Sequence, residues 1–339
     1  MTLGLLRKLS ALAQDGAIIL GERPDRSPSL ADDPREFERL ARRLWSGAPV
    51  TQVGKGKVFA GKNIEATLAQ IGVPPDVADA GDPLSFVHRR LSDGDLYFVS
   101  NRLGRASRID ARFRVNGRQP EIWHADTGLV EPVSYRIEGA QTFVPLDLGP
   151  DESLFVVFRK PATAQSAEVA KPTLTEVARL TGPWNVAFQP GRGAPAAIRL
   201  PELTSLTEQA DPGVKYFSGL ATYATTVNLP AGTRAGAPLW LDLGKVGDVA
   251  EVRVNGTLVG TAWKAPYRVD IGPMVRTGSN AITIRVANLW VNRLIGDAQP
   301  GAQKIGFTLF PTYGPTTPLR PSGLIGPVRL LASPPEPRR

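Results

Sequence analysis

The chain has 339 residues, of which 42% are hydrophobic and 21% charged, values typical of a globular protein with room for two or three domains. It contains no cysteine, which excludes a disulfide framework and thiolate metal sites. The formal net charge is +8 and lies mostly in residues 163–339, where the arginines stand singly among predicted strands, which favours a solvated basic surface over a nucleic-acid partner. No apolar run is long enough to cross a membrane, and Arg7 and Lys8 interrupt the apolar start. Neither a membrane segment nor a signal peptide is therefore predicted, and the location of the chain stays open.

Residues 1–82 show the alternation of strand and helix that is typical of an α/β fold. Short strands are predicted at 16–20 and 58–60. Asp33 followed by proline is a cap and first-turn signature for one helix, and Asn63 is placed to cap a second helix. Two strand–helix units are few for an independent domain, so we interpret this segment as the remnant of a larger α/β domain.

Residues 83–160 change to short strands separated by turns, the pattern of a small antiparallel β-sandwich. The predicted strands are 86–91, 95–100, 109–115, 120–123, 130–135, 142–146 and 153–158. Residues 161–173 are poor in bulky apolar side chains and predict a linker. Residues 335–339 are rich in proline and charge and predict a frayed tail.

Residues 174–334 predict a second antiparallel sandwich, so the fold class is mostly β. Leucines at 239, 241 and 243 alternate with other residues, the period that buries one face of a strand. Asn255-Gly256 supplies two residues that tolerate positive φ and predicts a tight hairpin. The whole stretch 239–297 is predicted as consecutive strands with almost no helix.

Parts of this second sandwich resemble known carbohydrate-active proteins. The segments LDLGKVGDVAEVRVNGTLVG, APYRVDI and GSNAITIRVANLWVNRLIGD resemble the galactose-binding-like jelly roll that is appended to many glycoside hydrolases. NLWVNRLIGD and PSGLIGPVRL resemble, more specifically, the C-terminal region of bacterial α-L-rhamnosidases of glycoside hydrolase family 106. The likeness covers about residues 15–331 and includes no catalytic barrel. It implies an α/β segment that follows a barrel, and a parent enzyme that is periplasmic or secreted.

Hydrolysis of a glycosidic bond normally needs two carboxylates roughly 5–10 Å apart. The candidates in the second sandwich are Asp242, Asp248, Glu251, Asp270 and Asp297. The first four are interpreted as solvent-facing or turn carboxylates. Asp297 follows the NRLIGD loop and holds either Arg293 or a sugar hydroxyl, with a local turn or surface ion pair as the simpler alternative. No catalytic pair is identified, so the chain alone is expected to be inactive.

Metal and cofactor motifs are absent from the sequence. The two histidines, His88 and His124, are 36 positions apart, and no HExxH, CxxC or Ser-His-Asp pattern occurs. Neither a metal nor a cofactor is expected. His88 remains a candidate contact to a neighbouring domain, with a packed structural histidine as the simpler alternative.

Aromatic rings can stack on sugars, and polar side chains at a strand end can recognise hydroxyl groups or a second domain. The candidates for substrate binding or interdomain contact are Trp263, Tyr267, Trp290, Asn292, Arg293, Asp297, Tyr313 and His88. For the rings, packing in the core or over the ends of the sandwich is the simpler alternative. Arg293 is expected to be buried or aimed at another domain.

Two hypotheses follow for the function. In the first, the chain is the non-catalytic C-terminal part of an α-L-rhamnosidase, and its partner is the upstream catalytic barrel. In the second, it is a stand-alone carbohydrate-binding β-sandwich protein whose partner is a glycan. The incomplete α/β pattern at the beginning of the chain favours the first.

Overall fold

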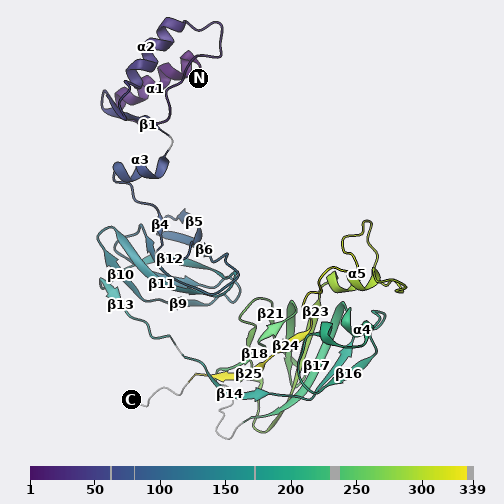
Figure 1. Ribbon diagram of the computed structural model, residues 1–339. Coiled ribbons are helices and arrows are strands. Elements are labelled where there is room, and N and C mark those ends of the chain that lie inside the picture. The colour runs from purple at the N-terminus through teal and green to yellow at the C-terminus, as the bar shows by residue number, and fades with distance from the viewer. Residues whose placement is uncertain (62, 80, 172, 230–236, 334–339) are drawn as a thin grey trace. The chain divides into compact units, whose positions relative to one another are not determined.

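A computed structural model describes residues 1–339 except 62, 80, 172, 230–236 and 334–339 (Figure 1). The tail predicted at 335–339 lies outside the described residues. The protein is mostly β, as predicted, with several antiparallel sheets. It divides into two compact units, one of Met1–Ala78 with Ala111–Gly117 and Ile137–Phe143, the other of the remaining residues. The domain boundaries given above stay predictions. No helix among the described residues is long and apolar enough to span a bilayer.

The first part of the chain packs helices on a three-stranded sheet of order β1-β3-β2. Strands β1 and β3 are parallel, and β2 and β3 are antiparallel. The elements are α1 Leu3–Asp15, β1 Ile18–Leu20, α2 Pro34–Leu44, β2 Val50–Val53, β3 Gly56–Phe59 and α3 Ile64–Gln70. The predicted caps are confirmed, because Asp33 accepts a hydrogen bond from the Arg35 amide and Asn63 from the Ala66 amide.

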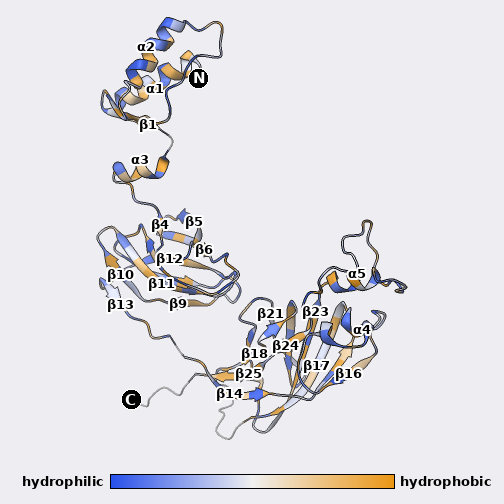
Figure 2. Ribbon diagram, in the orientation of Figure 1, coloured by the Kyte–Doolittle hydropathy of each residue, from blue (hydrophilic) through white to orange (hydrophobic). Residues whose placement is uncertain are grey.

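Helix α1 was not predicted from the sequence. It begins after Thr2, whose hydroxyl accepts from the Leu5 amide, and ends at Gly16, which has a φ of 116°. Its buried face includes Leu6 and Ala13, so its apolar residues fill a core. Figure 2 shows hydrophobic and hydrophilic segments mixed along α1 and α2, as expected for helices with one buried face.

The middle of the chain forms two five-stranded sheets, of order β13-β10-β11-β7-β4 and β5-β6-β12-β8-β9. Their strands are β4 Val77–Ala78, β5 Ser85–Arg90, β6 Asp95–Ser100, β7 Ser107–Phe113, β8 Arg118–Trp123, β9 Val130–Pro132, β10 Tyr135–Glu138, β11 Gln141–Leu148, β12 Ser153–Pro161 and β13 Ser166–Ala167.

One strand prediction for this region is wrong. The predicted strand 130–135 is divided, because β9 pairs with β8 in one sheet and β10 with β13 in the other. The predicted linker 161–173 contains the two-residue strand β13, and its boundaries stay predictions. Both details depend on pairing with distant strands, which local composition does not encode.

The last part of the chain forms the second sandwich, with a four-stranded sheet β14-β25-β18-β22, a six-stranded sheet β16-β15-β17-β23-β20-β21 and the short pair β19-β24. Side chains from both larger sheets, including Trp184, Tyr223, Leu241, Ile284 and Leu330, share one core. The strands are β14 Thr175–Leu180, β15 Trp184–Phe188, β16 Ala197–Leu200, β17 Gly219–Asn228, β18 Leu239–Asp242, β19 Lys245–Val246, β20 Val249–Val254, β21 Thr257–Ala262, β22 Arg268–Asp270, β23 Ser279–Asn288, β24 Leu324–Gly326 and β25 Val328–Ala332.

Short helical segments interrupt these strands. They are the 3-10 helices η1 Leu206–Glu208 and η2 Gly272–Met274 and the α-helices α4 Pro212–Lys215 and α5 Val291–Asp297. The prediction of almost no helix between 239 and 297 is therefore wrong for α5. A single helix of seven residues is too short for its period to stand out beside a ten-residue strand.

The hairpin predicted at Asn255-Gly256 is confirmed. Their φ angles are 52° and 83°, and Val254 pairs with Thr257 across the turn. The Asn255 side chain fixes the turn to the next strand, because its Nδ2 donates to Asn280 Oδ1 at 3.0 Å and its Oδ1 accepts from the Ala281 amide at 3.0 Å. The sequence signal and the tertiary contacts therefore agree at this turn.

Replacing Gly256 by valine is expected to lower the free energy of unfolding by about 1 kcal/mol or more, because a β-branched side chain is strained at positive φ. Space is not the reason, since a Cβ at Gly256 would meet no atom within 4 Å. Urea unfolding measures the change, and Thr257→Val, at an exposed position in β21, is the matched control. Equal stability of the two variants would contradict the strain at residue 256.

Candidate functional site

The short helix α5 brings polar residues of the predicted site together beyond the end of β23 (Figure 1). Arg293 and Asp297 lie one helical turn apart, and Arg293 Nε donates to Asp297 Oδ1 at 2.9 Å. Their side chains are only 6% and 7% exposed. Arg293 is thus buried, as expected, and the alternative of a surface ion pair with Asp297 is wrong.

Asp297 also fixes the loop that follows α5. Its second oxygen, Oδ2, accepts from the backbone amides of Ile305 at 3.1 Å and Gly306 at 2.6 Å. Both carboxylate oxygens are therefore engaged inside the protein. Asp297 holds Arg293 in one orientation and joins the loop to the helix, so it is a structural acceptor.

Arg293 lines a cleft of about 490 Å³. Its guanidinium carbon lies 5.9 Å from the centre of the Tyr216 ring, close enough for a cation–π contact. Two glycines allow this approach: a Cβ on Gly296 would lie 2.5 Å from Arg293 Nη2, and one on Gly193 would lie 3.4 Å from Nη1. Tyr216, Gly193 and Gly296 were not identified from the sequence as neighbours of Arg293. The only signal in the sequence was the presence of the two glycines at positions where no turn had been predicted.

The other candidates near α5 have different environments. Trp290 is 45% exposed, and the Arg192 guanidinium lies 4.8 Å from its ring centre. Asn292 is buried and exchanges two hydrogen bonds with the Arg320 backbone, at 2.6 and 2.8 Å. Asn292 therefore anchors the chain before β24 and has its amide groups occupied. Tyr313 is half-buried.

Trp263 and Tyr267 lie on the segment that joins β21 to β22 and do not form part of the cleft beside Arg293. Trp263 is 56% exposed, whereas Tyr267 is half-buried. Burial raises the pKa of the Tyr267 phenol, and the negative charge of Asp248 raises it further. Trp263 is therefore the ring of this pair that is open to a ligand.

His88 has a structural environment in the first sandwich. Its Nε2 lies 3.0 Å from Asp95 Oδ1, and its ring stacks on Tyr97 at a centroid distance of 4.1 Å. His88 pairs with Tyr97, and Asp95 lies at the start of the same strand β6. These contacts join two neighbouring strands, which supports the simpler alternative for this histidine.

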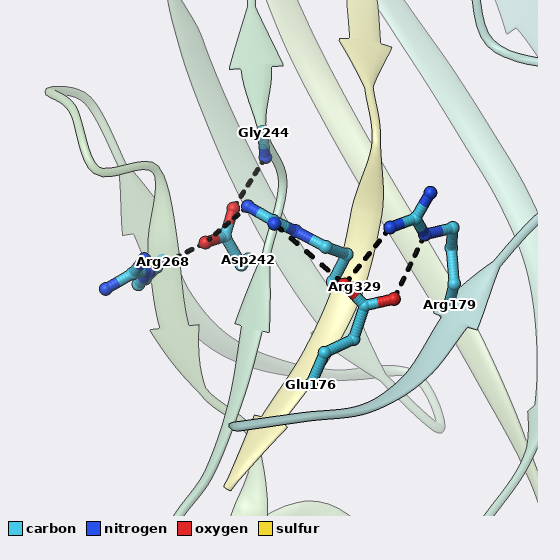
Figure 3. Close-up of polar contacts among 6 residues, drawn as sticks. All are labelled: Glu176, Arg179, Asp242, Gly244, Arg268 and Arg329. Atoms are coloured by element: carbon cyan, nitrogen blue, oxygen red, sulfur yellow. Dashed lines mark hydrogen bonds and ion pairs between the residues drawn. The ribbon is translucent and has the colours of Figure 1, made fainter. Parts of the chain in front are cut away.

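Asp242 was expected to be a solvent-facing or turn carboxylate; it accepts from an amide two residues further on, as in a turn, but it is not solvent-facing. It is 3% exposed and accepts from Arg268 Nε at 2.8 Å, Arg329 Nη2 at 3.4 Å and the Gly244 amide at 2.8 Å. Figure 3 shows this arrangement, with Glu176 and Arg179 beside it. Arg329 Nη1 also lies 3.9 Å from Glu176 Oε2, so the network ties all four strands of one sheet together.

The remaining carboxylates of this sandwich also support the architecture. Asp270 Oδ1 accepts from the Leu239 and Gly272 amides, at 3.1 and 3.0 Å. Glu251 lies 3.0 Å from Arg253. Asp248 lies 3.2 Å from Arg320, which opposes the increase in the Asp248 pKa caused by burial. In the described part of the chain, no three His, Asp or Glu side chains gather as metal ligands.

The fold defines the last part of the chain as an antiparallel β-sandwich. A family model described as the glycosyl hydrolase 2 galactose-binding domain-like family matches residues 214–308. The α-L-rhamnosidase model of glycoside hydrolase family 106 matches residues 1–137. The match to the α-L-rhamnosidase model therefore lies in a different part of the chain from the motifs at 288–297 and 321–330, on which the resemblance to family 106 was based.

Similarity to known proteins supports the same assignment. A solved rhamnosidase from Novosphingobium sp. PP1Y is 52% identical, with a TM-score of 0.86 over 98% of this chain and 32% of its own. A Formosa agariphila protein provisionally named a beta-glucuronidase is 22% identical over 86% of this chain and 44% of its own length. The chain thus spans about a third of the solved rhamnosidase and less than half of the second relative. The resemblance to a family 106 α-L-rhamnosidase with a galactose-binding-like domain is confirmed.

Proposed function

We propose that this chain is the non-catalytic C-terminal part of a family 106 α-L-rhamnosidase that acts in carbohydrate degradation, and that its partner is the upstream catalytic barrel. The observation that carries this proposal is the 52% identity to the Novosphingobium rhamnosidase across almost the whole chain, which corresponds to 32% of that protein. A likeness of this extent favours a shared role within a larger enzyme over a fold-level analogy.

The positions of the candidate carboxylates support the non-catalytic part of the proposal. A general acid and a nucleophile or base must face the scissile bond across an open site. Asp242 and Asp297 instead lie buried against arginines, and Asp270 accepts from two backbone amides. These carboxylates serve the packing of the sandwich, so the acid and base are assigned to the barrel.

An exposed apolar segment after α5 supports the presence of a partner domain. Phe307, Leu309 and Phe310 are 88%, 82% and 78% exposed. Three large apolar side chains so close together in water are typical of a surface that another protein surface covers. We assign this surface to the remaining two-thirds of the parent enzyme, because the solved relative has that additional length.

We expect the purified chain to show no hydrolysis of 4-nitrophenyl α-L-rhamnopyranoside above the spontaneous rate, because the acid and base belong to the barrel. Release of 4-nitrophenol measures the reaction, with the Novosphingobium rhamnosidase as the positive control. Turnover that disappears when one Asp or Glu of this chain is replaced by its amide would overturn the proposal.

The alternative of a stand-alone carbohydrate-binding protein has one supporting observation. The Trp263 ring is 56% exposed, and an exposed ring can stack on the apolar face of a pyranose. Two results together would favour this alternative. The Trp263→Ala change would abolish glycan binding by the chain, and a separately expressed catalytic barrel would bind neither the chain nor the same glycan.

A further inference from the structure

Arg293 presents an unpaired edge of its guanidinium group inside the cleft beside α5. Its Nε is held by Asp297, but among the residues that the structure describes neither Nη nitrogen has a hydrogen-bond partner. The residue is only 5% exposed, and its Nη groups are not fully enclosed, since Arg293 lines the open cleft. Two charged donors that face a cleft and have no acceptor within the described part of the chain are available to a ligand that enters the cleft.

The orientation of this edge is fixed before any ligand arrives. Asp297 is anchored by the amides of Ile305 and Gly306 and holds the Nε side of the guanidinium group, and the guanidinium carbon lies 5.9 Å from the centre of the Tyr216 ring. The planar fork therefore keeps Nη1 and Nη2 as two donors in one plane. That geometry matches the two oxygens of a carboxylate.

The charges around the cleft favour an anion even though Asp297 is near. Lys215 Nζ lies 5.8 Å from the centre of the Tyr216 ring, and Arg192 lies over Trp290. Neither cation has an ion-pair partner within the described residues. With Arg293 there are three cations, against the carboxylates of Asp297 and of Asp211, which accepts from the Gly213 amide at the cleft, so a further carboxylate is electrostatically favoured.

The cleft also has the size and chemistry for a sugar ring. Its volume of about 490 Å³ is within the range of small-molecule sites. Pro212, Tyr216 and Ile305 supply apolar surface. Gln299 donates to the Ile295 and Pro315 carbonyls, at 3.2 and 2.9 Å, which fixes its amide and leaves Oε1 as an acceptor for a hydroxyl group.

We propose that the Arg293 cleft binds an acidic sugar, with the two Nη groups of Arg293 donating to the carboxylate of a hexuronate. That the carboxylate is carried by a sugar rests on the proposed function in carbohydrate degradation. The site is separate from the exposed ring of Trp263.

The test is a titration of the ¹⁵N-labelled chain with sodium D-galacturonate and sodium D-glucuronate at constant ionic strength. We expect shifts of the amide signals of Gly193, Gly296 and Gln299, and binding at least about tenfold tighter than that of D-galactose or D-glucose, which lack the charge-assisted bonds. Arg293→Lys keeps the charge but loses the fork, and is expected to weaken binding by about tenfold or more. Arg253→Lys, in a surface ion pair, is the matched control and should bind as the unchanged chain does.

Equal affinity for a uronate and its neutral sugar would overturn the proposal, as would unchanged binding in a folded Arg293→Lys variant. The comparison of uronate with neutral sugar uses the unchanged chain, so it decides the matter even if the variant fails to fold. Absence of uronate binding would also overturn it, and would leave an acidic side chain of the barrel as the acceptor. A failure to bind uronate would contradict the uronate site but would not change the expected result of the hydrolysis assay. Hydrolysis of a rhamnoside by the chain would contradict the proposed non-catalytic function but would not contradict binding of a uronate.

Discussion

Replacing Asp297 by alanine is expected to lower the free energy of unfolding of the second sandwich by about 3 kcal/mol or more. The change removes the partner of a buried charge, and breaking a buried ion pair from one side typically costs about 3–5 kcal/mol. Arg293 would remain 95% buried without its acceptor, and the amides of Ile305 and Gly306 would lose theirs. Urea unfolding followed by tryptophan fluorescence measures the effect, because four of the six tryptophans lie in this sandwich.

Two further variants separate the charge from the packing. Asp297→Asn retains an acceptor oxygen and should fall between the unchanged chain and Asp297→Ala. Glu251→Gln weakens an ion pair with the partly exposed Arg253 and should change stability by less than about 1 kcal/mol. A loss in Asp297→Ala no larger than that in Glu251→Gln would show that the helix does not depend on this ion pair.

Replacing Asp242 by alanine is expected to destabilise the same sandwich by about 2–3 kcal/mol, at or below the lower end of the range of about 3–5 kcal/mol that breaking a buried pair typically costs. The cost is smaller than for Asp297 because the Arg268 and Arg329 side chains are each 33% exposed and water can solvate them in part. The carboxylate nevertheless bridges β22 and β25 to β18 and accepts from the Gly244 amide (Figure 3). Urea unfolding measures this change as well.

The matched control for Asp242 lies in the same network. Arg179→Ala removes an ion pair with Glu176 in which the arginine is 52% exposed, and should cost less than about 1 kcal/mol. The double variant Asp242→Ala with Arg268→Ala should be less destabilised than the sum of the two single changes, because both remove one interaction. Strict additivity would show that Asp242 and Arg268 do not depend on each other.

These two carboxylates explain why acidic residues in this chain are poor guides to catalysis. Asp242 and Asp297 each neutralise a cation and accept a backbone amide at a place where the chain leaves a strand or a helix. A carboxylate whose oxygens are both engaged inside the protein does not face a scissile glycosidic bond across an open site. The role that we propose for the sandwich is therefore recognition, by Arg293 and by exposed rings.

The sequence by itself determined the strand pattern, the tight turns and the helix caps. Alternation of apolar side chains predicts which face of a strand is buried, and the pair Asn255-Gly256 predicts its hairpin, because both depend on residues within one or two positions. The caps at Asp33 and Asn63 are local in the same way. The family resemblance also came from short runs of residues.

Only the tertiary structure decided which polar residues are buried and what they face. Asp242 is buried because Arg268 and Arg329, 26 and 87 positions away, reach it from neighbouring strands. Arg293 and Asp297 meet because residues 291–297 turn into a helix, and Tyr216 and Gly193 close the cleft from elsewhere in the chain. A local pattern fixes the direction of a side chain, but its environment depends on strands and loops that fold against it from distant positions.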